Sequence, residues 1–112
     1  MKRIEAWVKP FELDDVAAAL RAAGVAGATA TEVRSFGIQV VESMYRGAPY
    51  RIDSFLEVKL EVVVHNDVVE RVISALVTTS TTAGDGDGEI LVLPVDDAIR
   101  IRTGEIAEAA IA

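Results

Sequence analysis

Cysteine is absent from the 112-residue chain. Without thiols, the chain can form no disulfide, no thiolate nucleophile and no thiolate metal site, which fits a reducing compartment. We therefore expect a cytoplasmic protein that holds no metal. His65 is the one histidine, and no nucleophile–base pair can be assembled around it, so the sequence does not predict an enzyme.

Positive charge is also scarce. Eleven Lys and Arg residues face 18 Asp and Glu residues, which gives a net charge of −7. Affinity for nucleic acid comes largely from basic side chains that displace counterions, so we expect no binding to nucleic acid or to anionic membranes. The opening residues, MKRIEAWVKP, contain no apolar run of the length that a signal peptide or a membrane span requires, and we expect neither.

Apolar residues make up 51% of the chain, enough for one domain over residues 1–112 with its own core. Their spacing predicts a strand, a helix and a strand, and then the same order again. The predicted elements are RIEAWVK (3–9), FELDDVAAALRAAG (11–24), ATATEVRSFGIQV (28–40), FLEVKLEVVV (55–64), NDVVERVISALVTT (66–79) and EILVLPV (89–95). Gly24 is the expected C-cap of the first helix, and Asn66 is placed to cap the second.

This order predicts an α+β fold, the ferredoxin-like βαββαβ sandwich. Its four-stranded antiparallel sheet has two helices on one face and leaves the other face open. On so apolar a chain we expect the open face to be apolar and to be covered by other copies in a closed symmetric oligomer.

A long loop is expected between the second and third strands. The segment VVESMYRGAPYRIDS (40–54) has no strand or helix period, and loops of this length in a small domain are usually functional or disordered. It holds Tyr45, Arg46, Tyr50 and Arg51, a composition typical of interfaces, so we favour a binding role over a plain connector.

The glycine-rich stretch TTAGDGDGE (81–89) has the composition of an ion-binding loop. An EF-hand register with Gly88 at the turn places Ala83 and Pro94 at ligand positions, which excludes calcium. A Walker loop needs a lysine that is missing. Two possibilities remain open, a nest of backbone N–H groups that cradles an anion and a plain turn between helix and strand.

A second indication of an anion site lies in AIRIRTGE (98–105). Strand alternation would place Arg100 and Arg102 on one side, and guanidinium groups bind phosphate with a fixed fork of donors. The alternative is an edge strand protected by charge. The paired arginines and the glycine loop together favour a nucleotide or other anion site.

The stretches KPFELDDVAAAL, TEVRSFGIQ, YRGAPY, GDG and RIRTGE, in this order over nearly the whole chain, resemble the PII signal-transduction proteins. The resemblance implies a homotrimer that binds adenine nucleotides in the clefts between subunits and responds to ATP, ADP and 2-oxoglutarate. It also implies that a docking loop, about residues 38–54, controls a transporter or a metabolic enzyme in nitrogen or inorganic-carbon regulation. The phosphate loop would span about residues 81–89. The implied nucleotide contacts are Gly37, Val64, Gly86, Asp87, Gly88, Arg100 and Arg102.

Several residues depart from the family pattern. Gly84 and Glu89 stand where lysines are usual, a difference of about three charge units near the phosphates, each worth roughly 1 to 4 kcal/mol at contact distance. Gln39 is kept at the base of the loop, but Glu57 replaces a lysine that would meet 2-oxoglutarate. Trp7 could stack on an adenine or crowd it.

Two interpretations follow from these departures. The first is a PII-like sensor retuned toward ADP, AMP or a cyclic nucleotide over ATP, with no obligatory cofactor. The alternative is a trimeric interaction module that has lost nucleotide and 2-oxoglutarate sensing. Tyr50 matches the tyrosine that some members have uridylylated, although its neighbour here is Pro49, where an acid is usual.

Overall fold

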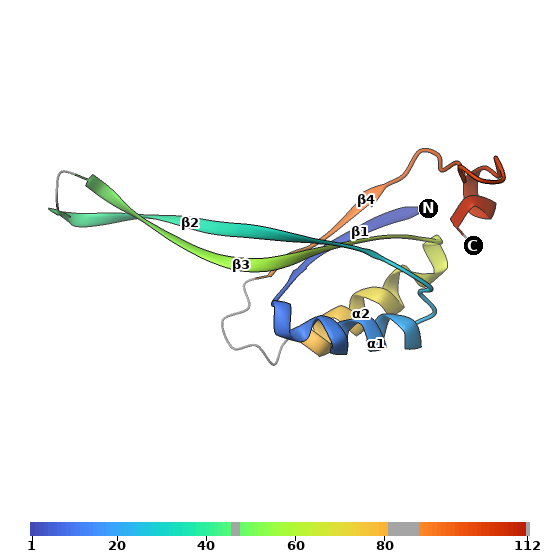
Figure 1. Cartoon of the computed structure of the whole chain (residues 1–112), viewed down its shortest axis with the longest axis horizontal. Coiled ribbons are helices and arrows are strands. Elements are labelled where there is room, and N and C mark those ends of the chain that lie inside the picture. Colours follow the sequence, from blue (N-terminus) through green and yellow to red (C-terminus); the bar gives the residue numbers. More distant parts are fainter. Residues whose placement is uncertain (46–47, 81–87, 112) are drawn as a thin grey trace.

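The computed structural model describes residues 1–45, 48–80 and 88–111, without the side chains of 39–45, 48–51 and 80. Four antiparallel strands form one sheet in the order β2-β3-β1-β4, and two helices cover one of its faces (Figure 1). The ferredoxin-like prediction is therefore confirmed. The elements are β1 Lys2–Val8, α1 Leu13–Ala22, β2 Thr29–Tyr45, β3 Ala48–Val64, α2 Val69–Ser80 and β4 Ile90–Pro94.

The helices dock through the apolar faces that the sequence spacing predicts. Val16 and Leu20 on α1, and Val72 and Leu76 on α2, are buried against Ile4 and its neighbours on the sheet. Ala23 is the C-cap of the first helix, and Gly24 directly after it has φ +98°, a left-handed conformation that favours glycine, so the helix ends at the predicted glycine, one residue before the expected position of the cap.

The predicted cap of the second helix is wrong. A short 3-10 turn, Asn66–Val68, precedes α2, and His65 occupies the cap position with no side-chain hydrogen bond to the backbone. The Val68 amide donates instead to the His65 carbonyl over 3.0 Å. This backbone bond closes the turn without a side-chain oxygen.

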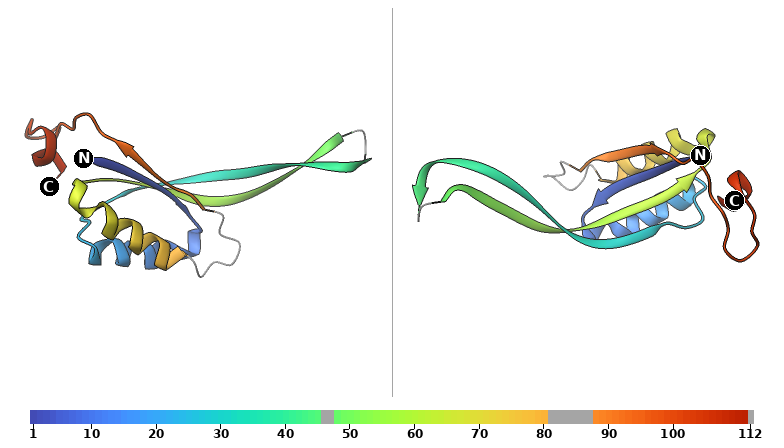
Figure 2. Two further views of the ribbon diagram at one scale, coloured as in Figure 1. Left: turned by 180° about the vertical axis from the view of Figure 1, so that it is seen from behind. Right: turned by 90° about the horizontal axis from the view of Figure 1, so that it is seen from above.

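Residues 40–54, which lack a strand period, nevertheless belong to strands wherever they are described. β2 and β3 pair from Thr29↔Glu61 to Val40↔Tyr50 and again at Tyr45↔Ala48, with an irregularity between. They extend as a two-stranded ribbon away from the helices, and the molecule measures 58 × 27 × 21 Å (Figure 2). No helix among the described residues covers either face of the ribbon (Figures 1 and 2), so the ribbon needs no apolar–polar alternation.

The open face of the sheet is more charged than the composition predicts. Glu5 lies 3.2 Å from the Arg3 Nε and 3.6 Å from the Lys59 Nζ, and Lys59 also pairs with Glu61. The expectation of an apolar open face is therefore wrong. Exposed apolar side chains occur on this face at Leu91, which pairs with Glu5, and in larger number on the ribbon and near the C-terminus: Phe36, Ile38, Ile52, Leu56, Ile99, Ile101 and Ile106.

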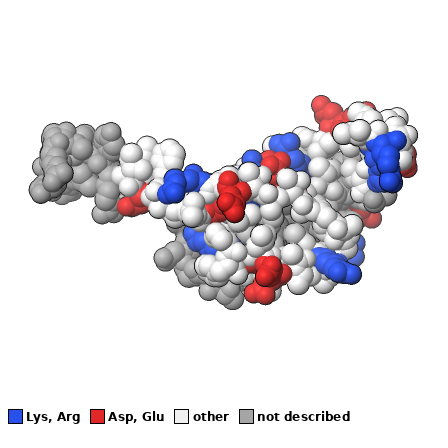
Figure 3. Space-filling model, viewed as in Figure 1, with Lys and Arg blue, Asp and Glu red and all other residues white. Residues whose placement is uncertain are grey.

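Charges of both signs are scattered over the surface in Figure 3, and no continuous basic stripe crosses that face. On this face the described residues suit the acidic composition and offer no track for a phosphate backbone.

Candidate functional site

The candidate site lies where β1 extends past the first residue of β4. β1 pairs with β4 only over Lys2–Ala6, so Trp7, Val8 and Lys9 continue beyond it. Gly88, which precedes β4, approaches this free stretch so closely that a Cβ on it would lie 2.9 Å from the Trp7 carbonyl oxygen. Glycine is therefore required here for steric reasons.

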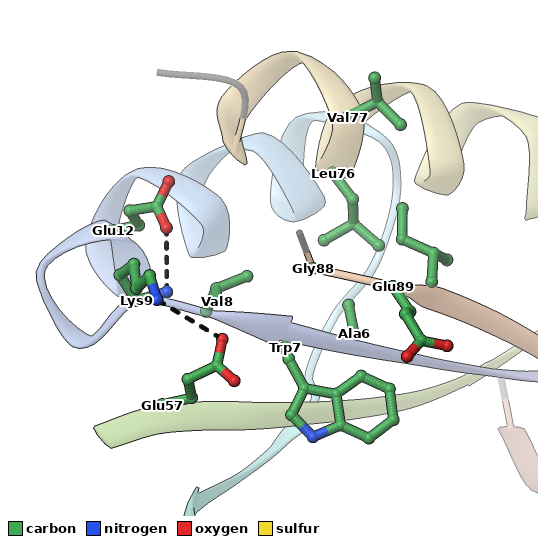
Figure 4. A pocket seen from close by; sticks show the side chains of 11 residues that line it. Ala6, Trp7, Val8, Lys9, Glu12, Glu57, Leu76, Val77, Gly88 and Glu89 are labelled. Atoms are coloured by element: carbon green, nitrogen blue, oxygen red, sulfur yellow. Dashed lines mark hydrogen bonds and ion pairs between the residues drawn. The ribbon is translucent and has the colours of Figure 1, made fainter. Parts of the chain in front are cut away.

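Beside this contact lies a cavity of about 180 Å³ (Figure 4). Its apolar wall comes from β1, α2 and β4, and its charged wall carries one lysine and three glutamates. The lining residues are Ala6, Trp7, Val8, Lys9, Glu12, Glu57, Leu76, Val77, Gly88, Glu89 and Ile90.

A larger cleft of about 510 Å³ adjoins the cavity and shares Lys9, Glu57 and Glu89 with it. The cleft is lined by Trp7, Lys9, Ser35, Phe55, Glu57, Gly88 and Glu89. Ser35 and Phe55 are paired residues of β2 and β3 at the base of the ribbon. A ligand in this cleft would therefore touch the elements that lead into the ribbon.

Lys9 connects three parts of the site. Its backbone amide donates to Glu12 Oε1 over 2.9 Å, and this bond fixes the turn before α1. Its ammonium lies 3.9 Å from Glu57 Oε2 and 4.3 Å from the centre of the Phe55 ring. Both glutamates are buried, Glu12 to 5% and Glu57 to 8% exposure.

Trp7 forms part of the wall of both hollows. The Lys59 ammonium lies 5.6 Å from its ring centre, within the range of a cation–π contact. Lys59 thereby links the indole to the Glu5 ion pairs on the open face.

The structure brings only some of the predicted site residues together. Gly88 lines both hollows, and Gly37 lies exposed on β2 opposite Asp53, at the base of the ribbon. Gln39 and Tyr50 lie in the ribbon strands, but their side chains are outside the described part. Gly86 and Asp87 are outside the described residues altogether.

Arg100 and Arg102 do not lie on a strand, so the predicted alternation is wrong. The Arg100 amide donates to the Glu105 carbonyl, and the Gly104 amide donates to the Arg100 carbonyl, each over 2.8 Å. These bonds close a turn, stabilised by Gly104 at φ +74°. The Arg100 guanidinium donates to the Ala110 carbonyl, while Arg102 is exposed.

Within one chain the two arginines are also far from Gly88. Gly88 precedes β4 and the arginines follow it, so the length of this strand, roughly 15 Å, separates them. Val64 lies at the end of β3 opposite Lys2, with its side chain in the core and outside both hollows. Its predicted place beside an adenine stays a prediction.

Sequence reasoning missed Lys9 and Glu12. The signal was present, because a glutamate three residues after a turn-starting residue is the spacing of a capping box. The pairing of Lys9 with Glu57 could not be seen, since 48 positions separate them and only the β1–β3 register brings them together.

Two classes of site find no support in the described ranges. No group of three or more His, Cys, Asp and Glu side chains among residues 1–45, 48–80 and 88–111 is arranged to hold a metal ion. No helix in that part of the chain is long and apolar enough to span a membrane.

A family model and the sequences of known proteins all match this chain to one protein family. The family model for nitrogen regulatory protein P-II matches residues 1–105. The chain is 52% identical to the nitrogen regulatory protein P-II of Cereibacter sphaeroides and to that of Haemophilus influenzae, over 99% of this chain and 100% of each relative. It is 47% identical to the nitrogen regulatory protein P-II 1 of Escherichia coli over the same shares.

Proposed function

The chain belongs to the nitrogen regulatory protein P-II family, and from that membership we propose that it acts as a homotrimeric regulator that binds an adenine nucleotide between subunits. Nucleotide binding then biases the β2–β3 ribbon, through which the protein controls a transporter or a metabolic enzyme. The regulated process is nitrogen or inorganic-carbon metabolism.

One observation carries this proposal. The cleft beside Gly88 has Ser35 and Phe55 in its wall, and both belong to the base of the ribbon. A ligand that contacts Gly88 and these side chains favours some ribbon conformations over others, and a partner protein can sense that population shift.

A second copy supplies the phosphate contacts. Gly88 precedes β4, whereas Arg100 and Arg102 follow it. One chain therefore cannot bring Gly88 and the two arginines to the same ligand. An oligomer whose C-terminal turn faces the cleft of its neighbour joins them. Each cleft then combines backbone N–H groups from one subunit with guanidinium groups from the next.

Charge favours ligands with few phosphates. Lys9 is the one cation among the described residues that line the two hollows, against Glu12, Glu57 and Glu89. Each unit of like charge near a phosphate costs roughly 1 to 4 kcal/mol at contact distance. ADP, AMP or a cyclic nucleotide therefore binds more tightly than ATP.

Isothermal titration with ATP, ADP, AMP, cyclic AMP and 2-oxoglutarate tests the proposal. We expect ADP, AMP or cyclic AMP to bind more tightly than ATP, and 2-oxoglutarate to bind weakly because Glu57 repels it. Absence of heat with every nucleotide would falsify the proposal.

The excess of carboxylates in the hollows also favours a second candidate, a trimeric interaction module without nucleotide sensing. A chain carrying both Arg100→Ala and Arg102→Ala distinguishes the two. If the protein is a sensor, nucleotide changes the partner binding of the wild type but not that of the double variant. If the protein is an interaction module, nucleotide does not change the partner binding of the wild type either.

A further inference from the structure

A groove lies between α1 and the start of β2, away from the candidate site. Its volume is about 630 Å³, and it shares no lining residue with the cavity or the cleft beside Gly88. Ala30 of β2 pairs with the buried Leu60 of β3 and therefore faces the helix side of the sheet, yet it is exposed. The two helices thus leave this edge of the sheet uncovered.

The walls of the groove are apolar and partly formed by small residues. Leu13 and Leu20 of α1 line one side, and the loop between α1 and β2 lines the other with Val25 and the segment 26–28. Residues 26–28 are Ala, Gly and Ala, and all three are exposed. Another element can therefore approach this loop closely.

The charged residues of the groove both stand on α1. Asp14 and Arg21 line it and are exposed, and the ion pairs found among the described residues involve neither of them. Seven residues are close to two helical turns, so both side chains lie on one face of α1, about 10 Å apart along its axis. A partner at this face must supply one negative and one positive group at the same spacing.

This charge pattern is complementary to itself. The midpoint between Asp14 and Arg21 lies between Ala17 and Ala18, which are small and exposed. A second α1 that runs antiparallel across this point brings its Arg21 to Asp14 and its Asp14 to Arg21. One twofold contact then compensates all four charges, because the same patch serves both copies.

We propose that α1 and its groove form a twofold interface with a second copy of this chain. The interface lies on the helix side of the sheet (Figure 1), and it involves none of Gly88, Arg100 and Arg102. It is therefore distinct from the proposed nucleotide site. It joins two monomers or two trimers, according to the assembly that the chain otherwise forms.

Analytical ultracentrifugation of the full chain tests the proposal in the absence of nucleotide. We expect the mass of the smallest assembly to double reversibly as the protein concentration rises. A single mass over the whole concentration range overturns the proposal, whether that mass is a monomer or a trimer.

Charge reversal locates the interface. Asp14→Arg and Arg21→Asp, each alone, place like charges at both symmetric contacts, so each should lower the association constant about tenfold or more. An equimolar mixture of the two variants should regain the association, because every contact between unlike copies then joins opposite charges. Unchanged association of both single variants, or a mixture that associates no better than they do, overturns the proposal.

Asp15→Arg is the matched control. Asp15 is exposed in the same first turn of α1 but does not line the groove. Its reversal changes the net charge as Asp14→Arg does, and it removes the same favourable interaction with the helix dipole. We expect wild-type association, and weakening equal to that of Asp14→Arg overturns the assignment to the groove.

This inference and the proposed nucleotide function fail separately. Doubling of the mass requires no nucleotide, so it persists in a protein that binds none. Nucleotide binding by a protein whose mass never doubles removes the twofold interface and leaves the nucleotide site intact.

Discussion

Lys9 connects β1, the turn before α1 and β3 at the candidate site. Its amide fixes the turn into α1 through Glu12, and its ammonium offsets the charge of Glu57 on β3. The resemblance drew attention to Glu57 as a residue that repels an anion. Its pairing with Lys9 from another strand reduces that repulsion without removing it, because the ion pair is loose and Glu89 adds a second carboxylate to the same cleft.

Removing the Lys9 charge should destabilise the fold through Glu57. We expect Lys9→Met to lower the free energy of unfolding by about 1–2 kcal/mol, below the cost for fully buried pairs, because the Lys9 side chain is 23% exposed. The double variant Lys9→Met, Glu57→Gln should recover most of this loss, since no uncompensated charge remains. Urea denaturation of the four proteins measures the coupling, and strict additivity of the two changes would contradict it.

Gly88 gives a steric prediction at the same scale. Gly88→Ala places a methyl group 2.9 Å from the Trp7 carbonyl oxygen, and the backbone must move. We expect a loss of about 1–3 kcal/mol in unfolding free energy. Gly27→Ala is the control, because its Cβ meets nothing within 4 Å and the change should be neutral or slightly stabilising. Equal stability of the two variants would show that the close approach is absent.

At the scale of elements, hydrophobic periodicity predicts the strands and helices that pack against a core. β1 and α1 follow it because one face of each is buried against the other, as Ile4 and Val16 show. It fails for residues 41–54 of the ribbon, where Ile52 pairs with Ile38 of the predicted strand and both side chains are exposed. It also fails at Arg100, where local backbone bonds to Glu105 and Gly104 replace strand pairing. In the sequence, Gly104 is the residue that indicates a turn in this segment.

Ile38 and Ile52, the exposed apolar pair on the ribbon, should contribute little to the free energy of unfolding. We expect the double variant Ile38→Thr, Ile52→Thr, which keeps β-branched side chains in paired strands, to change the unfolding free energy by less than about 0.5 kcal/mol. Val72→Ala on α2, at a position with 0% exposure, should cost about 2 kcal/mol in the same assay. A comparable loss from the ribbon variant would mean that the ribbon packs against something in the folded state.

At the scale of the whole molecule, the single chain leaves its proposed site incomplete. Gly88 and the cleft lie at one end of β4, and the arginine-bearing turn lies at the other. Around that turn, Ile99, Ile101 and Ile106 are exposed, Ile101 completely. Isolated exposed isoleucines are common, but a cluster on a C-terminal turn is typical of a contact with another subunit. A contact between neighbouring copies at this turn would explain both the incomplete site and the exposed isoleucines.

Subunit mixing tests this arrangement most directly. If the proposed site is shared between copies, chains with Gly88→Asp and chains with both Arg100→Ala and Arg102→Ala should each fail to bind ADP, because each set of changes disrupts one side of every cleft. When the two are unfolded and refolded together into random trimers, about one cleft in four receives both intact sides. We predict that calorimetry of the mixture recovers ADP binding at about a quarter of the wild-type stoichiometry, with wild-type affinity. A mixture that binds no more ADP than its separate components would contradict a site shared between copies.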